Sequence, residues 1–120
     1  MADRPRQDLL ARSFAFVKEI LDRYPRLASG GPAHEHMALQ LFKAASSLGA
    51  NLEEGQVANS RRDMANKYAV ALREVRESHY WLRLFATDSK WTEELAPLIA
   101  ESREFIAMLT TSVRNLRKPL

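Results

Sequence analysis

Hydrophobic residues recur along most of this chain with the period of an amphipathic α-helix. Four segments of about 20 to 27 residues carry apolar side chains at steps of three and four positions, which gathers them on one helix face. None of these segments alternates with the two-residue period of a β-strand. The pattern predicts four helices, at about residues 6–27, 34–54, 61–86 and 96–117.

The first segment shows the pattern clearly. Its apolar stripe consists of Leu10, Phe14, Val17, Leu21 and Tyr24, with charged residues between them. We expect this stripe to face the core. We also expect Pro25 to end the helix, because proline lacks the N–H group that the next turn would use.

Glycine, serine and proline mark the other helix boundaries. Gly55 is placed to cap the end of the second helix. Ser60, with Asp63 three residues later, resembles a capping box at the start of the third. Pro97 is best tolerated in a first turn, which predicts that the fourth helix begins near Ala96, after a separate turn.

The connections between the predicted helices are short. Only four glycines and five prolines occur in 120 residues, which leaves too few turns for a many-stranded β-fold. Short loops make consecutive helices antiparallel neighbours. We therefore predict an all-α fold: one domain over residues 1–120, an antiparallel up-down-up-down four-helix bundle.

Composition narrows the chemistry. The absence of cysteine excludes disulfides, thiolate catalysis and cysteine-bound metals. Eighteen basic and fifteen acidic residues give a net charge of +3, a mild excess that is compatible with nucleic acid. No apolar run approaches the ~20 residues that span a bilayer, and the first residues lack the apolar stretch of a secretory signal. We expect a cytoplasmic protein without membrane contact.

The second and third predicted helices carry a distinctive motif. Residues 43–51 read Lys-Ala-Ala-Ser-Ser-Leu-Gly-Ala-Asn, and Glu54-Gly55 and Ser60-Arg61-Arg62-Asp63-Met64 follow. This motif resembles the signature of the 23S rRNA intervening-sequence protein family. Two later runs, in residues 74–82 and 98–112, are also similar to one branch of that family, so the resemblance covers about residues 9–118.

The resemblance implies a short up-down bundle that assembles into a ring-shaped homopentamer and has no enzymatic activity. A related group accompanies diversity-generating retroelements, where it binds the reverse transcriptase and nucleic acid. This chain departs from the family pattern at Met64, where phenylalanine is usual, and at Arg73 and Arg76, where acidic or small residues are common. The two arginines make the third helix more basic than the family pattern implies.

Positive charge is concentrated on the third helix and near the end of the chain. Cations that converge on one surface can neutralise several phosphates together and release their counterions. In a ring each subunit would repeat the patch, and weak contacts would add through avidity. The alternative is a solvated helix face with ion pairs three or four residues apart. The candidate nucleic-acid contacts are Arg61, Arg62, Lys67, Arg73, Arg76, Arg83, Arg114, Arg117 and Lys118.

Several large aromatic side chains fall beside the predicted core stripes. Rigid aromatic residues off the core face are typical of subunit interfaces, although a wide buried stripe would also take in some of them. We expect the chain to self-assemble through these residues. The candidate interface residues are Phe16, Tyr80, Trp81, Trp91 and Phe105.

Two residues of the second predicted helix are expected to serve packing. Asn51 lies near the apolar stripe, and we expect it to make a buried hydrogen bond with Glu54 or Glu77 as its partner. Gly49 interrupts a helical pattern, which indicates close approach of another helix. We assign all of these a structural role.

The sequence offers no constellation of catalytic or metal-binding residues. No glutamate has a histidine three residues later, as the di-iron bundles require. His34 and His36 have no evident third ligand. We expect no metal, no cofactor and no enzymatic activity.

These observations favour a non-enzymatic homo-oligomeric binding module, expected to be a pentamer. We expect its basic helix faces to contact RNA or DNA, with or without a protein partner. The alternative is a purely structural or protein-interaction scaffold that binds no nucleic acid. A helix-turn-helix DNA binder with a recognition helix from Ser60 would need shorter helices that cross steeply, which argues against it.

Overall fold

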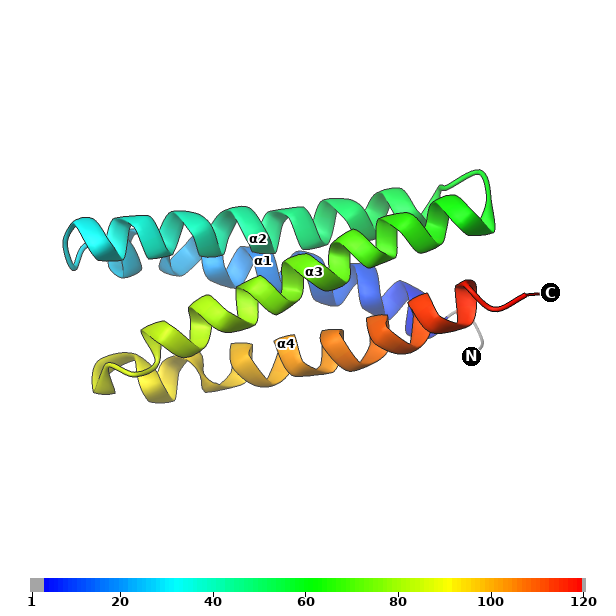
Figure 1. Ribbon diagram of the computed structural model, residues 1–120. Coiled ribbons are helices and arrows are strands. Elements are labelled where there is room, and N and C mark those ends of the chain that lie inside the picture. The colour runs from blue at the N-terminus through cyan, green and yellow to red at the C-terminus, as the bar shows by residue number, and fades with distance from the viewer. Residues whose placement is uncertain (1–3, 120) are drawn as a thin grey trace.

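The chain forms four long helices (Figure 1). The structure, a computed structural model, describes residues 4–119, with side chains from residue 9 onward. The helices are α1 (Arg4–Ala28), α2 (Pro32–Gln56), α3 (Arg61–Phe85) and α4 (Ser89–Leu116), and the described residues contain no strand. The all-α prediction is confirmed. Residues 1–3 and 120, which the predicted single domain also includes, lie outside the described residues.

Side-chain contacts show that neighbouring helices run in opposite directions. Between α2 and α3, the ring of His36 meets Trp81 with centroids 5.9 Å apart, while Glu54 pairs with Lys67 at 2.8 Å. One residue number rises as the other falls, which requires an antiparallel pair. The same holds for the remaining neighbours, so α1 begins and α4 ends at the same end of an up-down-up-down bundle (Figure 1).

The core is filled by one apolar side chain per helical turn, and the few buried polar groups are satisfied locally. Ser78 donates to the Glu74 carbonyl at 3.0 Å, and Ser102 donates to the Ile99 carbonyl at 2.7 Å. A hydroxyl that bonds to a carbonyl of its own helix can be buried without being left unpaired. The core of α2 and α3 includes Leu41, Leu48, Leu52, Tyr68, Ala71, Val75 and Leu82.

The buried face of α1 differs from the predicted stripe. The residues that enter the core are Leu9, Phe16, Ile20 and Leu27, whereas Phe14 is 72% exposed and Leu21 is 48% exposed. α1 therefore carries two adjacent apolar lines, each with helical spacing. The line that packs into the core is the one that faces both α2 and α4. Of the predicted line, Phe14, Val17 and Leu21 border a groove between α1 and α2, while Leu10, Val17 and Tyr24 are partly buried at the edge of the core.

Three aromatic residues predicted at a subunit interface belong to the core of a single chain. Phe16, Trp91 and Phe105 are each no more than 2% exposed, so the interface prediction is wrong for these three. The reason is geometric: the backbones of α1 and α4 approach less closely than those of consecutive helices. Large rings fill the space, and Phe16 and Phe105 meet edge to face with centroids 5.6 Å apart.

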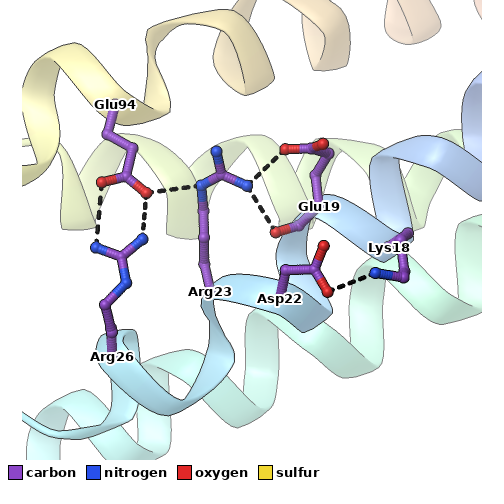
Figure 2. Close-up of polar contacts among 6 residues, drawn as sticks. All are labelled: Lys18, Glu19, Asp22, Arg23, Arg26 and Glu94. Carbon is purple, nitrogen blue, oxygen red and sulfur yellow. Dashed lines mark hydrogen bonds and ion pairs between the residues drawn. The ribbon is translucent and has the colours of Figure 1, made fainter.

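Ion pairs also connect α1 to α4. Glu94 at the start of α4 binds both Arg26 and Arg23 of α1 (Figure 2), the latter at 2.9 Å. The hydrogen bond from Arg26 is the main reason why the pKa of Glu94 lies below its ordinary value. Nearer the other end, Arg12 forks onto Glu101, with Nε–Oε2 and Nη2–Oε1 distances of 2.9 and 2.5 Å. A bidentate pair of this kind fixes orientation as well as charge.

Two prolines lie inside helices that were predicted to stop or start beside them. α1 continues past Pro25 to Ala28, and this extension buries Leu27. α4 begins at Ser89 rather than near Ala96 and includes Pro97. An internal proline costs about 3 kcal/mol of helix stability. Burial of Trp91 and Leu95 in the additional turns, together with the Glu94 ion pairs, offsets that cost.

The glycines of α2 also differ from their predicted roles. A Cβ atom at Gly49 would lie 3.5 Å from the Val17 side chain, an ordinary contact, so no close approach requires glycine there. Gly55 does not cap the helix, which continues to Gln56. Gly55 is buried under the Tyr68 ring. A Cβ atom at this position would lie only 2.5 Å from the Cε1 atom of Tyr68.

The two glycines give opposite predictions for substitution by alanine. Gly55→Ala should lower the free energy of unfolding by about 1–3 kcal/mol, because the Tyr68 ring must shift. Gly49→Ala should raise it by up to about 1 kcal/mol through helix propensity. Urea denaturation followed by circular dichroism measures both. Equal effects of the two substitutions would contradict the contact of Gly55 with Tyr68.

Candidate nucleic-acid interface

Four predicted cations converge where α3 begins and α4 ends. Arg61 and Arg62 come from the first turn of α3, and Arg117 and Lys118 follow the last turn of α4. Together with uncharged neighbours they line a shallow, open hollow. Among the residues whose side chains the structure describes, no carboxylate takes part in its lining. We call Arg61, Arg62, Arg117 and Lys118 the basic end cluster.

Arg61 joins the two helices of the cluster. Its Nη2 donates to the Asn115 carbonyl at 2.6 Å, and its Nε donates to the Leu116 carbonyl at 3.1 Å. These carbonyls belong to the last turn of α4, where backbone acceptors lack the regular N–H donor four residues later and carry partial negative charge. The Asn115 carbonyl also accepts from the Lys118 backbone N–H, at 3.3 Å. Arg61 thus caps α4, and this structural role could not be read from its position in the sequence.

The N-cap of α3 separates the cluster from nearby acidic groups. The Ser60 hydroxyl accepts a hydrogen bond from the Asp63 backbone N–H at 3.0 Å, as the capping prediction required. Asp63 lies with Glu54 and Lys67 in the adjacent hollow beside α2, rather than in the basic one. Lys67 pairs with Glu54 at 2.8 Å, so this predicted nucleic-acid contact is neutralised within the chain.

The remaining predicted cations do not join the basic end cluster. Arg73 lies 12 residues beyond Arg61, about 18 Å along α3, and its Nε atom is 3.5 Å from Glu74. Arg76 and Arg83 are exposed further along the same helix, and Arg114 is exposed in the last turn of α4 but does not line the hollow. The structure therefore divides the predicted basic face into a compact end cluster, scattered arginines on α3, and Arg114 on α4.

His79 lies beside two of the other cations. Burial lowers its pKa below the ordinary value, and the charges of Arg83 on α3 and Arg103 on α4 lower it further. Its Nε2 atom is buried and has no hydrogen-bond partner in the part of the chain that the structure describes. These surroundings favour a neutral imidazole in the folded chain.

The predicted structural polar residues are placed differently from expectation. Asn51 is partly buried, but its amide donates to the carbonyl and hydroxyl of Ser47 at 2.8 and 3.2 Å, not to a glutamate. Glu77 accepts a hydrogen bond from the Trp81 indole at 3.4 Å. Asn51 thus bonds within its own helix, because Ser47 lies one turn earlier on α2 and is within reach of the amide.

Two of the predicted interface aromatics remain at the surface. Tyr80 is 50% exposed, and Trp81 is partly buried with its ring centroid 5.0 Å from that of Tyr80.

Sequence reasoning missed the apolar groove between α1 and α2, since the residues that border it were assigned to the core. The double apolar line on α1 was the available signal.

Two other kinds of site are absent from the part of the chain that the structure describes. Residues 9–119 contain no group of three histidine, aspartate or glutamate side chains that could hold a metal ion. Among α1 to α4, no helix combines the length and apolarity needed to cross a bilayer.

The fold and its basic end define an all-α four-helix-bundle protein. The chain belongs to the 23S rRNA-intervening sequence protein family, whose model matches residues 6–111. A similar fold occurs in the crystal structure of a protein with unknown function from the S23 ribosomal protein family of Bacteroides thetaiotaomicron VPI-5482. The two chains share 28% sequence identity with a TM-score of 0.77, over 91% of this chain and 97% of the other. No curated protein matches this chain.

The contacts of Arg61 predict a local effect of its removal. Arg61→Gln should accelerate amide hydrogen exchange several-fold in residues 113–118, because the Leu116 and Asn115 carbonyls lose the guanidinium that joins the end of α4 to α3. Arg62→Gln removes the same charge without such a bond and serves as the control. Equal exchange rates in the two variants would contradict the capping role of Arg61.

His79 predicts a pH dependence of stability. Because its folded pKa lies below the unfolded value of about 6.5, the unfolded chain takes up a proton first as the pH falls. The free energy of unfolding should therefore decrease from about pH 6.5 downward, until the folded pKa is passed. His79→Gln should flatten this part of the curve in urea denaturation between pH 7 and 5. An unchanged slope would show that His79 is not the responsible group.

Proposed function

We propose that this chain is a non-enzymatic, cytoplasmic subunit of a homo-oligomer, a pentamer, that contacts RNA or DNA. Its phosphate contacts are the basic end clusters of the assembled copies, with or without a protein partner beside them. The observation that carries the proposal is the convergence of four cations on a hollow that no carboxylate of residues 9–119 lines.

The chemistry of the cluster suits a phosphate backbone better than a single small anion. The hollow is open, and Arg62, Arg117 and Lys118 are exposed around it. Exposed, convergent cations bind polyanions by releasing counterions, and they need little precise geometry for this. The contribution of each copy is modest, and repetition of the cluster around an oligomer would supply the affinity.

Elsewhere, much of the positive charge is committed to the fold. Lys18 pairs with Asp22 at 2.6 Å, Arg23 with Glu19 at 2.6 Å, and Arg12 with Glu101 at 2.5 Å. These pairs favour the alternative function, a scaffold whose cations serve folding and solubility. The scaffold alternative is weakest at the basic end cluster. Among the four cations of this cluster, Arg61 alone makes a side-chain hydrogen bond to another described residue that stabilises the fold.

Arg62→Gln/Arg117→Gln/Lys118→Gln tests the proposal while leaving Arg61 in place. Fluorescence anisotropy with a mixed-sequence single-stranded RNA measures binding between about 50 and 200 mM salt. We expect weaker binding, and a plot of log affinity against log salt that is shallower by about 2 for each subunit in contact with the RNA, because each lost contact to a single strand removes about 0.7. The control is Lys43→Gln/Lys90→Gln/Arg103→Gln, which loses the same charge at scattered exposed positions.

The outcomes separate the two functions. Equal losses in both triple variants would indicate net charge rather than a site. Absence of binding by the native chain at low salt would favour the scaffold. The pair Arg76→Gln/Arg83→Gln, assayed in the same way, measures the share of the arginines on α3, which remain predicted contacts.

A further inference from the structure

An apolar groove runs along the outside of the bundle between α1 and α2. Its volume is about 570 Å³ and its lining is almost wholly apolar. One wall is the outer line of α1, with Phe14, Val17 and Leu21, and the floor on α2 includes Gly49 and Ala50. Small residues on the floor and large ones on the wall leave room for side chains from outside.

The groove leaves unusually large apolar side chains in water. Phe14 is 72% exposed and Leu21 is 48% exposed, although α1 already supplies a complete second line to the core. Exposed apolar patches of this kind mark interaction surfaces in soluble proteins. The groove therefore fits a partner helix that presents apolar side chains one turn apart.

A matching ridge lies on another face of the same chain. Along the outside of α3, Tyr80 and Leu84 are 50% and 38% exposed, one turn apart. The same helix face continues backward through the exposed Arg76 and Arg73. Groove and ridge lie on different helices, so one copy can use both at once with two different neighbours.

The lengths and charges of the two surfaces agree in one register. On the α2 side, Phe42 and Glu53 mark the two ends of the groove, 11 residues or about 16 Å apart. On the ridge, Leu84 and Arg73 are also 11 residues apart. With Leu84 over Phe42, Arg73 therefore falls beside Glu53, which has no ion-pair partner among the described residues.

A second charge pair follows from the same alignment. Tyr80 falls over Ser46 and the exposed Glu77 falls at the level of Gly49, where Lys18 of α1 also lines the groove. Opposite charges thus meet at the levels of Gly49 and Glu53, and the apolar residues meet beside them, at the levels of Phe42 and Ser46. Lys18 keeps its own ion pair with Asp22 in this arrangement. Complementary charges at the rim of an apolar contact select the register and the partner.

This register also sets the orientation of the two copies. The docked α3 runs antiparallel to the α2 beneath it, and α3 is antiparallel to α2 within one copy as well (Figure 1). Both copies therefore point the same way along the bundle axis. A ridge that docks into the groove of the next copy gives a head-to-tail contact, which closes into a ring when the rotation allows it.

We infer that the α1–α2 groove binds the Arg73–Leu84 face of α3 from a second copy of this chain. The inference rests on the assembly in the proposed function and specifies its contact surfaces. In such a ring, the basic end clusters of all copies lie on one rim, about 27 Å along α3 from Tyr80 and clear of the contact.

Phe14→Glu and Tyr80→Glu test the two surfaces separately by sedimentation equilibrium. Both side chains are exposed in one chain, so each variant should fold, which circular dichroism confirms. Each variant alone should sediment with the mass of a single chain. Mixed together, they should form a one-to-one dimer, because one retains an intact ridge and the other an intact groove. Val57→Glu, at an exposed position outside both surfaces, is the control and should assemble like the native chain.

A charge exchange tests the register. Glu53→Arg and Arg73→Glu should each weaken assembly, and the double variant should restore it. Loss of assembly in Phe14→Glu alone, with Tyr80→Glu unaffected, would show that the groove pairs with itself and would overturn the inference. Assembly that survives both substitutions would overturn this docking surface but not the proposed function. If the native protein sediments with the mass of a single chain, self-assembly is contradicted both in this inference and in the proposed function.

Discussion

The fold depends on how the first helix is held against the last. Short loops bring α1 to α2, α2 to α3 and α3 to α4, but no loop joins α4 to α1. The closing contact instead uses long side chains: the edge-to-face rings of Phe16 and Phe105, and the guanidinium groups of Arg12, Arg23 and Arg26 on glutamates of α4. These side chains orient α1, and its orientation leaves Phe14 and Leu21 of a second apolar line exposed to water.

Much of the fold could be predicted from the sequence because it depends on local patterns. Helix number and direction follow from apolar spacing and short loops, and the Ser60 cap follows from its own side chain. The face of α1 could not be predicted, since the lines through Phe14 and through Phe16 both have helical spacing and only the position of α4 selects between them. The wide spacing of α1 and α4 also explains why Phe105 is buried, since its ring fills the space between these two helices.

The candidate site was predictable in kind but not in composition. The sequence places cations on the third helix and at the end of the chain. It does not distinguish an arginine that caps a helix from an arginine that is exposed at the surface. Only the structure distinguishes Arg61, bound to carbonyls of α4, from Arg62, and Lys67, neutralised by Glu54, from Lys118.

The direction of the helices has a practical consequence for handling the molecule. α1 begins and α4 ends at the end of the bundle that carries the cations (Figure 1). An affinity tag or fluorescent protein fused at either terminus would therefore crowd the surface that a binding assay is meant to probe. The α1–α2 and α3–α4 turns, at Gly30 and Thr87, lie at the opposite pole and are the better insertion points for a reporter.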